Sequence, residues 1–458
     1  MIGGVSGLAY AADKLFVADS NRVGAAPLNH RVLIFNDLSG SLPQPTDEFS
    51  FDRLCPACRG KANVVVGQPD FEKTEYSLTQ RGLRLPTAVA SDGRILVVAD
   101  TENNRVLIWR TIPTANGTPA DVVVGQPDFI KNSIPPGNVP NNRSMRGPQG
   151  VWIQNGRLYV ADTQNHRILI YNSIPTSNGA AADVVLGQPD FNTFVEPDLT
   201  QARLEAKASN MLNPVAVTSD GIRLYVTDLG HNRVLIWNSI PSSNQAPADI
   251  ALGQPDMNTA ESNNSPKLCP STGKDADGKD VFPPRCEATL DFPRFALSDG
   301  RRLFIADGGN DRVLVFDRVP TRSGEAADSV IGQLGGGINQ ATDSTDSLRA
   351  PMSLAWDGTN LYVSDSFNRR IMVYSIAAKD VPYSGVRNAA SFEIYAVGGI
   401  TFDGALTEGN EVTVKIELPK EGDREAVTAE YKYKLIKDDK FDTIVTTLVN
   451  MINGANDG

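Results

Sequence analysis

Short apolar runs that end in polar turn residues repeat along most of this chain. In each copy one run ends at an aspartate, a turn rich in asparagine and glycine follows, and a second run begins at an arginine. The six copies read LFVADS…NHRVLIF (15–35), ILVVADTENNRVLIW (95–109), LYVADTQNHRILIY (158–171), LYVTDLGHNRVLIW (224–237), LFIADGGNDRVLVF (303–316) and LYVSDSFNRRIMVY (361–374). Runs this short, rich in β-branched residues and bounded by turn residues, predict β-strands.

Two further strands flank most copies. A strand of small residues precedes the copy, as in PTAVAS (86–91), and a strand that ends in GQPDF follows it, as in DVVVGQPDF (121–129). Four short antiparallel strands in each of six units predict an all-β fold, a six-bladed β-propeller of four-stranded blades. The last blade is expected to take its outer strand from residues 393–399 or from the extreme N-terminus.

The repeated unit also resembles a known family. The pattern P-x-G/A-V…L-Y-V-A-D-T-x-N-H-R-V-L-I-F, clearest at 148–171, is similar to the NHL repeat, and the likeness covers roughly residues 5–398. The GQPDF strands resemble those of large secreted bacterial proteins of this kind. Members of the family fold as six-bladed propellers and serve as binding platforms, and a minority are metal-dependent lyases or lactonases. The resemblance therefore implies a binding protein, with an enzyme as the alternative.

The composition changes near residue 399, which divides the chain into a propeller (1–398) and a C-terminal module (399–458). Strand-like alternation is followed by apolar residues at helical spacing in FDTIVTTLVNMINGA (441–455), which predicts a small α+β module. The segment YKYKLIKDDKFDTIVTTLVNMINGAN resembles modules of bacterial surface and phage-tail-like proteins. Those modules continue with further strands, so this module is expected to be truncated.

The connections between units are long where a GQPDF strand leads to the next small-residue strand. They span 72–85, 130–147, 192–212, 258–292 and 337–350. In a propeller these connections emerge on one face, together with the turns between the second and third strands. Insertions gathered on one face of a repeat protein are typical of the binding face.

Each unit pairs an aspartate with an arginine across the tight turn. The pairs are Asp19/Arg31, Asp100/Arg105, Asp162/Arg167, Asp228/Arg233, Asp307/Arg312 and Asp365/Arg370. A guanidinium presents a planar fork that a carboxylate accepts. Since a reaction centre needs different roles at different positions, six identical pairs indicate structural turn clasps, and we predict no catalytic residue and no cofactor.

The turns and loops supply the remaining candidate site residues. His30 and His166 share one turn position with Asn104, Asn232, Asp311 and Arg369, and His231 lies one place earlier. These residues are the candidate binding-face residues, and hydrogen bonding within the turns is the alternative to zinc ligation. In KDADGKD (274–280), Asp275, Asp277 and Asp280 form a candidate calcium site, with a solvated acidic loop as the alternative.

All four cysteines lie in insertions. They predict the disulfides Cys55–Cys58 and Cys269–Cys286 and an oxidising compartment, with a zinc site or unpaired thiols as alternatives for Cys55 and Cys58. The start of the chain is not a secretory signal, so we expect that an N-terminal portion is missing or was removed. These features favour an extracellular or cell-surface protein.

Composition excludes other classes. The chain is 41% hydrophobic and 21% charged with a net charge of −11, which is globular and acidic. The acidic balance disfavours nucleic acid as partner, and no apolar run is long enough to predict insertion into a membrane.

We therefore expect a non-catalytic extracellular platform that recognises a protein, a glycan or a neighbouring subunit through the loop-rich propeller face. One alternative is a subunit of a filament or surface array, self-assembled by strand addition at the C-terminal module. Another is an enzyme of the propeller lyase or lactonase type.

Overall fold

The structure, a computed structural model, describes residues 3–20, 29–41, 62–194, 205–344, 346–375, 411–418 and 427–434. The chain divides into two compact units, Met1–Ser391 and Phe392–Gly458. In the second unit, β26 (Glu411–Leu418) pairs antiparallel with β27 (Val427–Lys434). The predicted boundary at 398/399 and the predicted helix at 441–455 lie outside the described residues.

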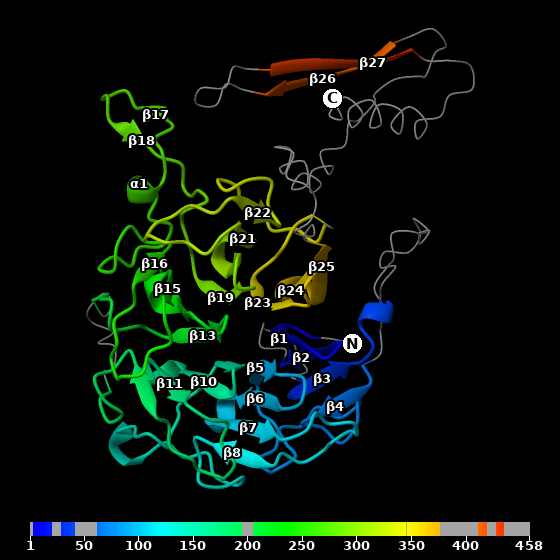
Figure 1. Ribbon diagram of the computed structural model, residues 1–458, viewed down its shortest axis with the longest axis vertical. Coiled ribbons are helices and arrows are strands. Elements are labelled where there is room, and N and C mark those ends of the chain that lie inside the picture. Colours follow the sequence, from blue (N-terminus) through cyan, green and yellow to red (C-terminus); the bar gives the residue numbers. More distant parts are fainter. Residues whose placement is uncertain are drawn as a thin grey trace. The chain divides into compact units, whose positions relative to one another are not determined.

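In the described residues of the first unit, six antiparallel sheets form the blades of a ring, and a seventh, two-stranded sheet lies in a connection (Figure 1). Four strands are described in each of blades 1 to 5, and three in blade 6. This architecture confirms the predicted all-β, six-bladed propeller. The segment 393–399, one candidate for the last outer strand, lies outside the described residues.

The strands of the first three blades are β1 (Val5–Ala11), β2 (Lys14–Asp19), β3 (Arg31–Phe35), β4 (Val64–Val66), β5 (Pro86–Ser91), β6 (Leu96–Asp100), β7 (Arg105–Trp109), β8 (Val122–Val124), β9 (Gly150–Gln154), β10 (Arg157–Asp162), β11 (Arg167–Tyr171) and β12 (Val184–Leu186). Those of the last three are β13 (Pro214–Ser219), β14 (Leu224–Asp228), β15 (Arg233–Trp237), β16 (Ile250–Leu252), β19 (Pro293–Ser298), β20 (Leu303–Asp307), β21 (Arg312–Phe316), β22 (Ser329–Ile331), β23 (Pro351–Trp356), β24 (Asn360–Asp365) and β25 (Arg370–Ser375).

Helical structure in the described residues is confined to connections. The helix α1 (Ser265–Leu268) and the hairpin β17 (Gly273–Lys274) and β18 (Asp280–Val281) lie between blades 4 and 5. Single 3₁₀ turns span Ser39–Ser41, Thr101–Asn103, Pro136–Asn138, Thr163–Asn165, Leu229–His231, Gly308–Asn310 and Ser366–Asn368. Among the helices of the described residues, none combines the length and apolar character needed to cross a lipid bilayer.

The ring closes between blade 6 and the N-terminal strand. The Leu8 backbone N–H donates to Ser353 Oγ at 3.0 Å, and the Ser366 hydroxyl donates to the Val5 carbonyl. Every blade therefore packs between two others. This explains why strands such as β6 and β7 are buried at every position and read as continuous apolar runs, because both faces of each sheet are covered.

Neighbouring blades also interlock at the rim of the ring. The Gly117 N–H, in the connection that precedes β8, donates to the Val65 carbonyl of β4 at 3.0 Å. The Val65 N–H in turn donates to Asn116 Oδ1 at 3.1 Å. The equivalent backbone bonds from Gly179, Gln245 and Gly324 reach β8, β12 and β16. Each of these bonds covers an outer sheet edge that would otherwise be open to another chain.

Every predicted Asp–Arg pair is present as an ion pair, and five of the six are buried almost completely. In blade 2, Arg105 Nε lies 2.7 Å from Asp100 Oδ2 with both side chains fully buried. The same carboxylate accepts the Asn103 side-chain N–H at 2.8 Å and the Arg84 backbone N–H at 2.6 Å. The other pairs join Arg31, Arg167, Arg233, Arg312 and Arg370 to their aspartates at 2.6–2.9 Å.

The buried arginines also hold the long connections. Arg105 Nη1 donates to the Phe129 carbonyl at 2.6 Å, in the connection that leaves its blade. Its Nη2 donates to the carbonyls of Thr79 and Gly82 at 2.9 and 3.1 Å, in the connection that enters the blade. Arg167, Arg233 and Arg312 make the same three kinds of contact at the same sequence distances. Each pair thus stabilises two loops as well as its own turn.

In blades 1 to 5 the glutamine of the GQPDF segment, which reads GQLGG in blade 5, bonds the turn after the second strand. Gly125 has φ +85°, and a Cβ there would lie 2.7 Å from the Met145 sulfur, so the close approach requires glycine. Gln126 Nε2 then donates to the carbonyls of Asn104 and Ser133 at 3.1 and 3.2 Å. The motif therefore joins the turn to the start of the following loop.

A third set of contacts links each turn to the next blade. The residue before the clasp arginine has positive φ in all six blades: His30, Asn104, His166, Asn232, Asp311 and Arg369. In five of them the side chain accepts a backbone N–H from the residue that precedes the next inner strand or lies close to it. The distances are 2.7–3.0 Å, from Leu85 to His30, Gly147 to Asn104, Asn213 to His166, Phe292 to Asn232 and Ala350 to Asp311.

Substitution of Arg167 by lysine tests the contribution of a clasp. Lysine keeps the charge but cannot serve the Asp162 carboxylate and three loop carbonyls together. We expect Arg167→Lys to lower the free energy of unfolding by about 3–5 kcal/mol, measured by denaturant titration. Arg370→Lys is the matched control, because that side chain is 26% exposed and water can replace the lost bonds. Equal losses in the two variants would contradict the role of burial.

His166 makes the fold sensitive to acid. Burial lowers its pKa to about 4 from the ordinary value of 6.5, and protonation would remove the Nδ1 lone pair that accepts the Asn213 N–H. Because the folded-state pKa is depressed, this contribution is complete above about pH 6.5 and is lost as the pH falls towards 4. Asparagine occupies the equivalent position in two other blades, as Asn104 and Asn232. We therefore expect His166→Asn to reduce the acid-induced loss in the free energy of unfolding by up to about 3 kcal/mol. Thermal unfolding at pH 7 and 4.5 measures it, and an unchanged pH dependence would refute it.

Candidate functional site

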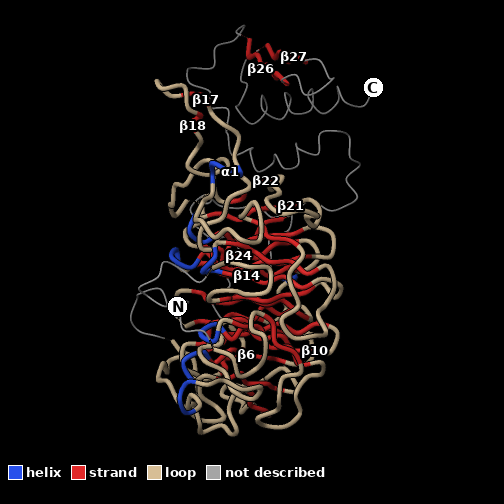
Figure 2. Tube along the Cα trace, turned by 90° about the vertical axis from the view of Figure 1, so that its left-hand side faces the viewer, coloured by secondary structure: helices blue, strands red, loops and turns tan. Residues whose placement is uncertain are grey.

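The long connections and the turns after the second strands lie at the same end of the blades. Figure 2 shows the ring from its side, with the 3₁₀ turns that follow the second strands gathered on one side. We call this the loop face, formed by residues 67–85, 125–148, 187–194, 205–213, 253–292 and 332–350 and by these turns. The hairpins between first and second strands form the opposite face.

Exposed large apolar side chains gather on the loop face. They are Phe71, Tyr76, Ile130, Ile134, Val139, Val281, Phe292, Leu334, Ile338 and Phe367. Leu334 is the most exposed, at 80%. In the part of the chain that the structure describes, the exceptions are Ile222 on the opposite face and Val373 on β25. The loop face therefore carries ten of the twelve large apolar side chains that are exposed in the described residues.

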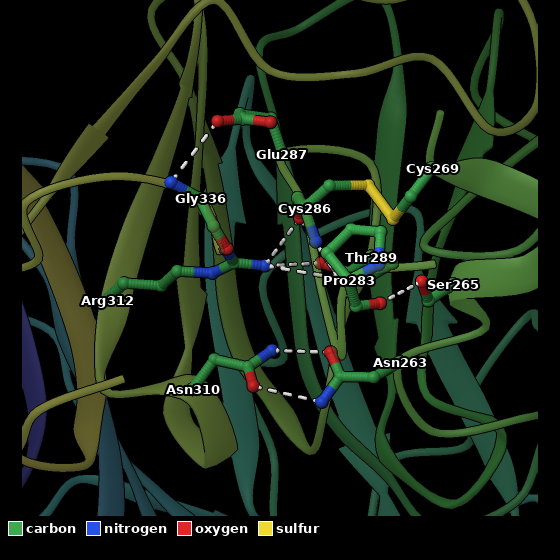
Figure 3. The surroundings of a disulfide bond; sticks show 10 residues. All are labelled: Asn263, Ser265, Cys269, Pro283, Cys286, Glu287, Thr289, Asn310, Arg312 and Gly336. Carbon is green, nitrogen blue, oxygen red and sulfur yellow. Dashed lines mark hydrogen bonds between the residues drawn. A yellow bond between two sulfur atoms is a disulfide. The ribbon is translucent and has the colours of Figure 1, made fainter. Parts of the chain in front are cut away.

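A disulfide-bonded arm extends from the loop face between blades 4 and 5. Cys269 and Cys286 are bonded, as predicted, and the hairpin of β17 and β18 beyond them extends away from the ring (Figures 1 and 2). Figure 3 shows how its base is held: Arg312 Nη2 donates to the carbonyls of Cys286 and Thr289 at 3.0 and 2.8 Å. The Cys55–Cys58 pairing lies outside the described residues.

The acidic residues of this arm make local contacts. Asp275 Oδ1 accepts the backbone N–H groups of Asp277 and Lys279 at 2.9 Å. Asp280 Oδ1 lies 3.0 Å from the Lys274 ammonium group. Within the described ranges, no three His, Cys, Asp or Glu side chains are grouped so that they could hold a metal ion.

The axis of the propeller is narrow. The inner strands leave a cavity of about 30 Å³. Its lining includes Ser6, Thr87, Gln149, Val215, Arg294 and Met352, one residue from each blade. Arg294 is the charged member of this set.

The predicted binding-face histidines are buried. His30 and His166 face the next blade through Nδ1, as described above, and burial lowers the pKa of His30 as well. His231 Nδ1 lies 2.9 Å from Asp228 Oδ2, in the place that asparagine takes in the other blades. Of this set of candidates, Arg369 is exposed. His231 thus bonds within its own turn, whereas His30 and His166 bond the backbone at the entrance to the next blade.

Sequence reasoning missed two kinds of position on the loop face. The exposed apolar loop residues share no motif, and no pattern distinguishes Leu334 from a buried leucine. The loop contacts of the clasp arginines do have a signal: the carbonyls lie 24 residues after the arginine and 26 and 23 residues before it in blades 2 to 5. This regular spacing is visible once the repeats are aligned.

Comparison with known proteins agrees with the fold. Residues 145–171 match the NHL repeat family. No curated protein matches the chain by sequence. Among solved structures, the chain is similar to a protein in a crystal structure of the nidogen/laminin complex, with 14% identity, 71% of this chain and 79% of that chain covered, and a TM-score of 0.35.

Two further structures belong to enzymes or their relatives. One is a putative 6-phosphogluconolactonase from Bacteroides uniformis, with 12% identity, 81% of both chains covered and a TM-score of 0.37. The other is a catalytically inactive virginiamycin B lyase from Staphylococcus aureus with quinupristin, with 11% identity, 82% of this chain and 85% of that chain covered and a TM-score of 0.33. At these values no activity is carried over. Residues 145–171, which form the entrance to blade 3 of this six-bladed propeller and its first three strands, β9, β10 and β11, thus match the NHL repeat, as the resemblance at 148–171 predicts.

Proposed function

We propose that this propeller is a non-catalytic extracellular platform that recognises a protein, a glycan or a neighbouring subunit through the loop face. The observation that carries this proposal is the concentration of exposed apolar side chains on that face. Such side chains lower the solubility of an isolated monomer and gain free energy when a partner covers them.

The clasps support the same function. A loop that is already ordered loses less conformational entropy when it binds than a mobile loop does. In blade 2 the Arg105 guanidinium bonds both the connection that enters and the connection that leaves the blade. The loops that present Tyr76 and Ile130 are therefore held in place before a partner arrives.

The axis gives the alternative, a lyase or lactonase, less support. Ligand pockets of enzymes usually measure about 300–1,000 Å³, and the axial cavity measures about 30 Å³. The one cationic group in its lining, Arg294, lies among hydroxyl, amide and apolar side chains, without a general base beside it in that lining. The chemistry of this site favours binding over turnover.

The disulfide bears on the location. The Cys269–Cys286 bond is compatible with an oxidising, extracellular compartment. Assembly by strand addition at the C-terminal module, calcium binding by the arm and the absence of nucleic-acid partners stay predictions.

A pair of matched variants tests the loop face. Leu334 and Ile222 are both exposed, at 80% and 65%, and lie on opposite faces. The whole chain is first used to select ligands from a glycan array or a displayed peptide library. We expect these ligands to bind Leu334→Asp at least ~10-fold more weakly than the natural chain, because the substitution places a charge in the apolar contact. Ile222→Asp should leave binding unchanged.

Two results of the same binding measurement would contradict the proposed loop-face site. Ligands that are lost by Ile222→Asp and retained by Leu334→Asp would move the site to the other face. Turnover of lactone substrates by the whole chain, with no loop-face ligand found, would replace the platform by the enzyme alternative. Thermal unfolding of both variants controls for loss of structure.

A further inference from the structure

The turn after the second strand of blade 6 departs from its five equivalents. Its positive-φ residue is Arg369, at +53°, where the others are asparagine, histidine or aspartate. Those residues accept a backbone N–H from the next blade, and a guanidinium has no acceptor atom. A long side chain also adopts this backbone conformation at a cost that Asn and Asp largely avoid. The side chain of Arg369 therefore cannot accept the inter-blade hydrogen bond that the equivalent side chains accept in five other blades.

The same turn carries a second departure. Two residues after the clasp aspartate, blade 6 has Phe367, which is 49% exposed. The equivalent residues are Glu102, Gln164, Gly230 and Gly309 in blades 2 to 5. An aromatic ring at this position gains little from folding, since half of it stays in water.

Arg349 completes the cluster. Its backbone N–H donates to Asp365 Oδ1 at 2.6 Å, which fixes the main chain, while its guanidinium carbon lies 5.7 Å from the centre of the Phe367 ring. Within the described ranges, neither the guanidinium of Arg349 nor that of Arg369 makes a hydrogen bond or a close ion pair, but the charge of Arg349 acts on the Asp311 carboxylate, whose pKa is raised by burial and lowered in part by that charge. We call Arg349, Phe367 and Arg369 the blade 6 cluster.

The composition of the cluster indicates its ligand. The Arg349 guanidinium beside the Phe367 ring, together with exposed Arg369 two residues further along the same turn, presents about five N–H donors on each arginine and an apolar surface in a chain of net charge −11. Guanidinium forks match carboxylates in geometry, and Arg and aromatic residues are enriched in the central contacts of protein interfaces. The complementary surface is a carboxylate next to an apolar side chain.

We propose that the blade 6 cluster binds an acidic segment of a partner protein, with carboxylates on Arg349 and Arg369 and an apolar side chain on Phe367. This inference rests on the proposed binding role of the loop face and names the partner chemistry for one part of it. An anionic polysaccharide would engage the arginines but would not need Phe367, so the two partners are distinguishable.

The blade 2 turn provides the test variant. The double variant replaces Phe367 by Glu and Arg369 by Asn. These are the residue types that blade 2 has at the equivalent positions, Glu102 and Asn104. The probe is a synthetic eight-residue peptide of alternating Glu and Leu, titrated by calorimetry into the whole chain. We expect the double variant to bind it at least ~10-fold more weakly, and low salt to strengthen binding to the natural chain.

Stability separates binding from folding. Asn tolerates positive φ and offers an acceptor to the next blade, so Arg369→Asn should leave the melting temperature unchanged or raise it while peptide affinity falls. A residue with a purely structural role would show a lower melting temperature. Arg322→Asn is the matched charge control, because Arg322 is exposed and lies in the connection between β21 and β22, on the opposite face.

Three outcomes would overturn the proposal. One is unchanged peptide affinity in the double variant. Another is equal binding of a peptide in which Ser replaces Leu, together with equal binding of an oligouronate, which would assign the cluster to anionic glycans. The third is a lower melting temperature of Arg369→Asn. If Leu334→Asp abolishes ligand binding while the blade 6 variant does not, the loop-face function stands and this inference alone fails.

Discussion

The buried Asp–Arg pair is the interaction on which the rest of this propeller depends. Two charges out of water cost several kcal/mol each unless every polar atom finds a partner. The pair of blade 2 meets this condition. The Asp100 carboxylate accepts hydrogen bonds from the side chains of Arg105 and Asn103 and from the backbone of Arg84. The same guanidinium donates its other hydrogen bonds to three loop carbonyls. If either loop moved, part of a buried charge would lose its hydrogen-bond partner. The buried ion pair therefore restrains the two surface loops that it contacts.

The residues that all blades share have a structural role. Groups that occur in every blade are saturated by one another, and saturated groups have no hydrogen bond left for a ligand. The proposed binding role therefore rests on positions where the blades differ: the exposed apolar residues of the loops, the disulfide-bonded arm and the turn of blade 6. The arrangement suits binding, because differing side chains stand on loops that are already ordered.

Much of the fold could be predicted from the sequence because the responsible signals are local and repeated. The strands, the six blades, the Asp–Arg pairs and the Cys269–Cys286 bond all follow from patterns within one unit or one insertion. The site could not be predicted as well, since its contacts join different blades. Nothing in the turn around His166 shows that its ring faces Asn213 of the next blade, and nothing around Leu334 shows that water surrounds it. Such facts depend on the angle between blades and on loops without a common sequence.

A repeat protein offers a comparison that a single-copy fold lacks, because equivalent positions share one backbone geometry and one set of neighbours. At the positive-φ position, five blades use a short side chain that accepts a hydrogen bond, and blade 6 uses Arg369. Asparagine meets the demands of this position in two of those blades, whereas an arginine side chain has no acceptor atom for the bond. A stabilising contact that is given up at one place in a ring, beside an exposed aromatic ring, is better evidence of a binding role than exposure by itself.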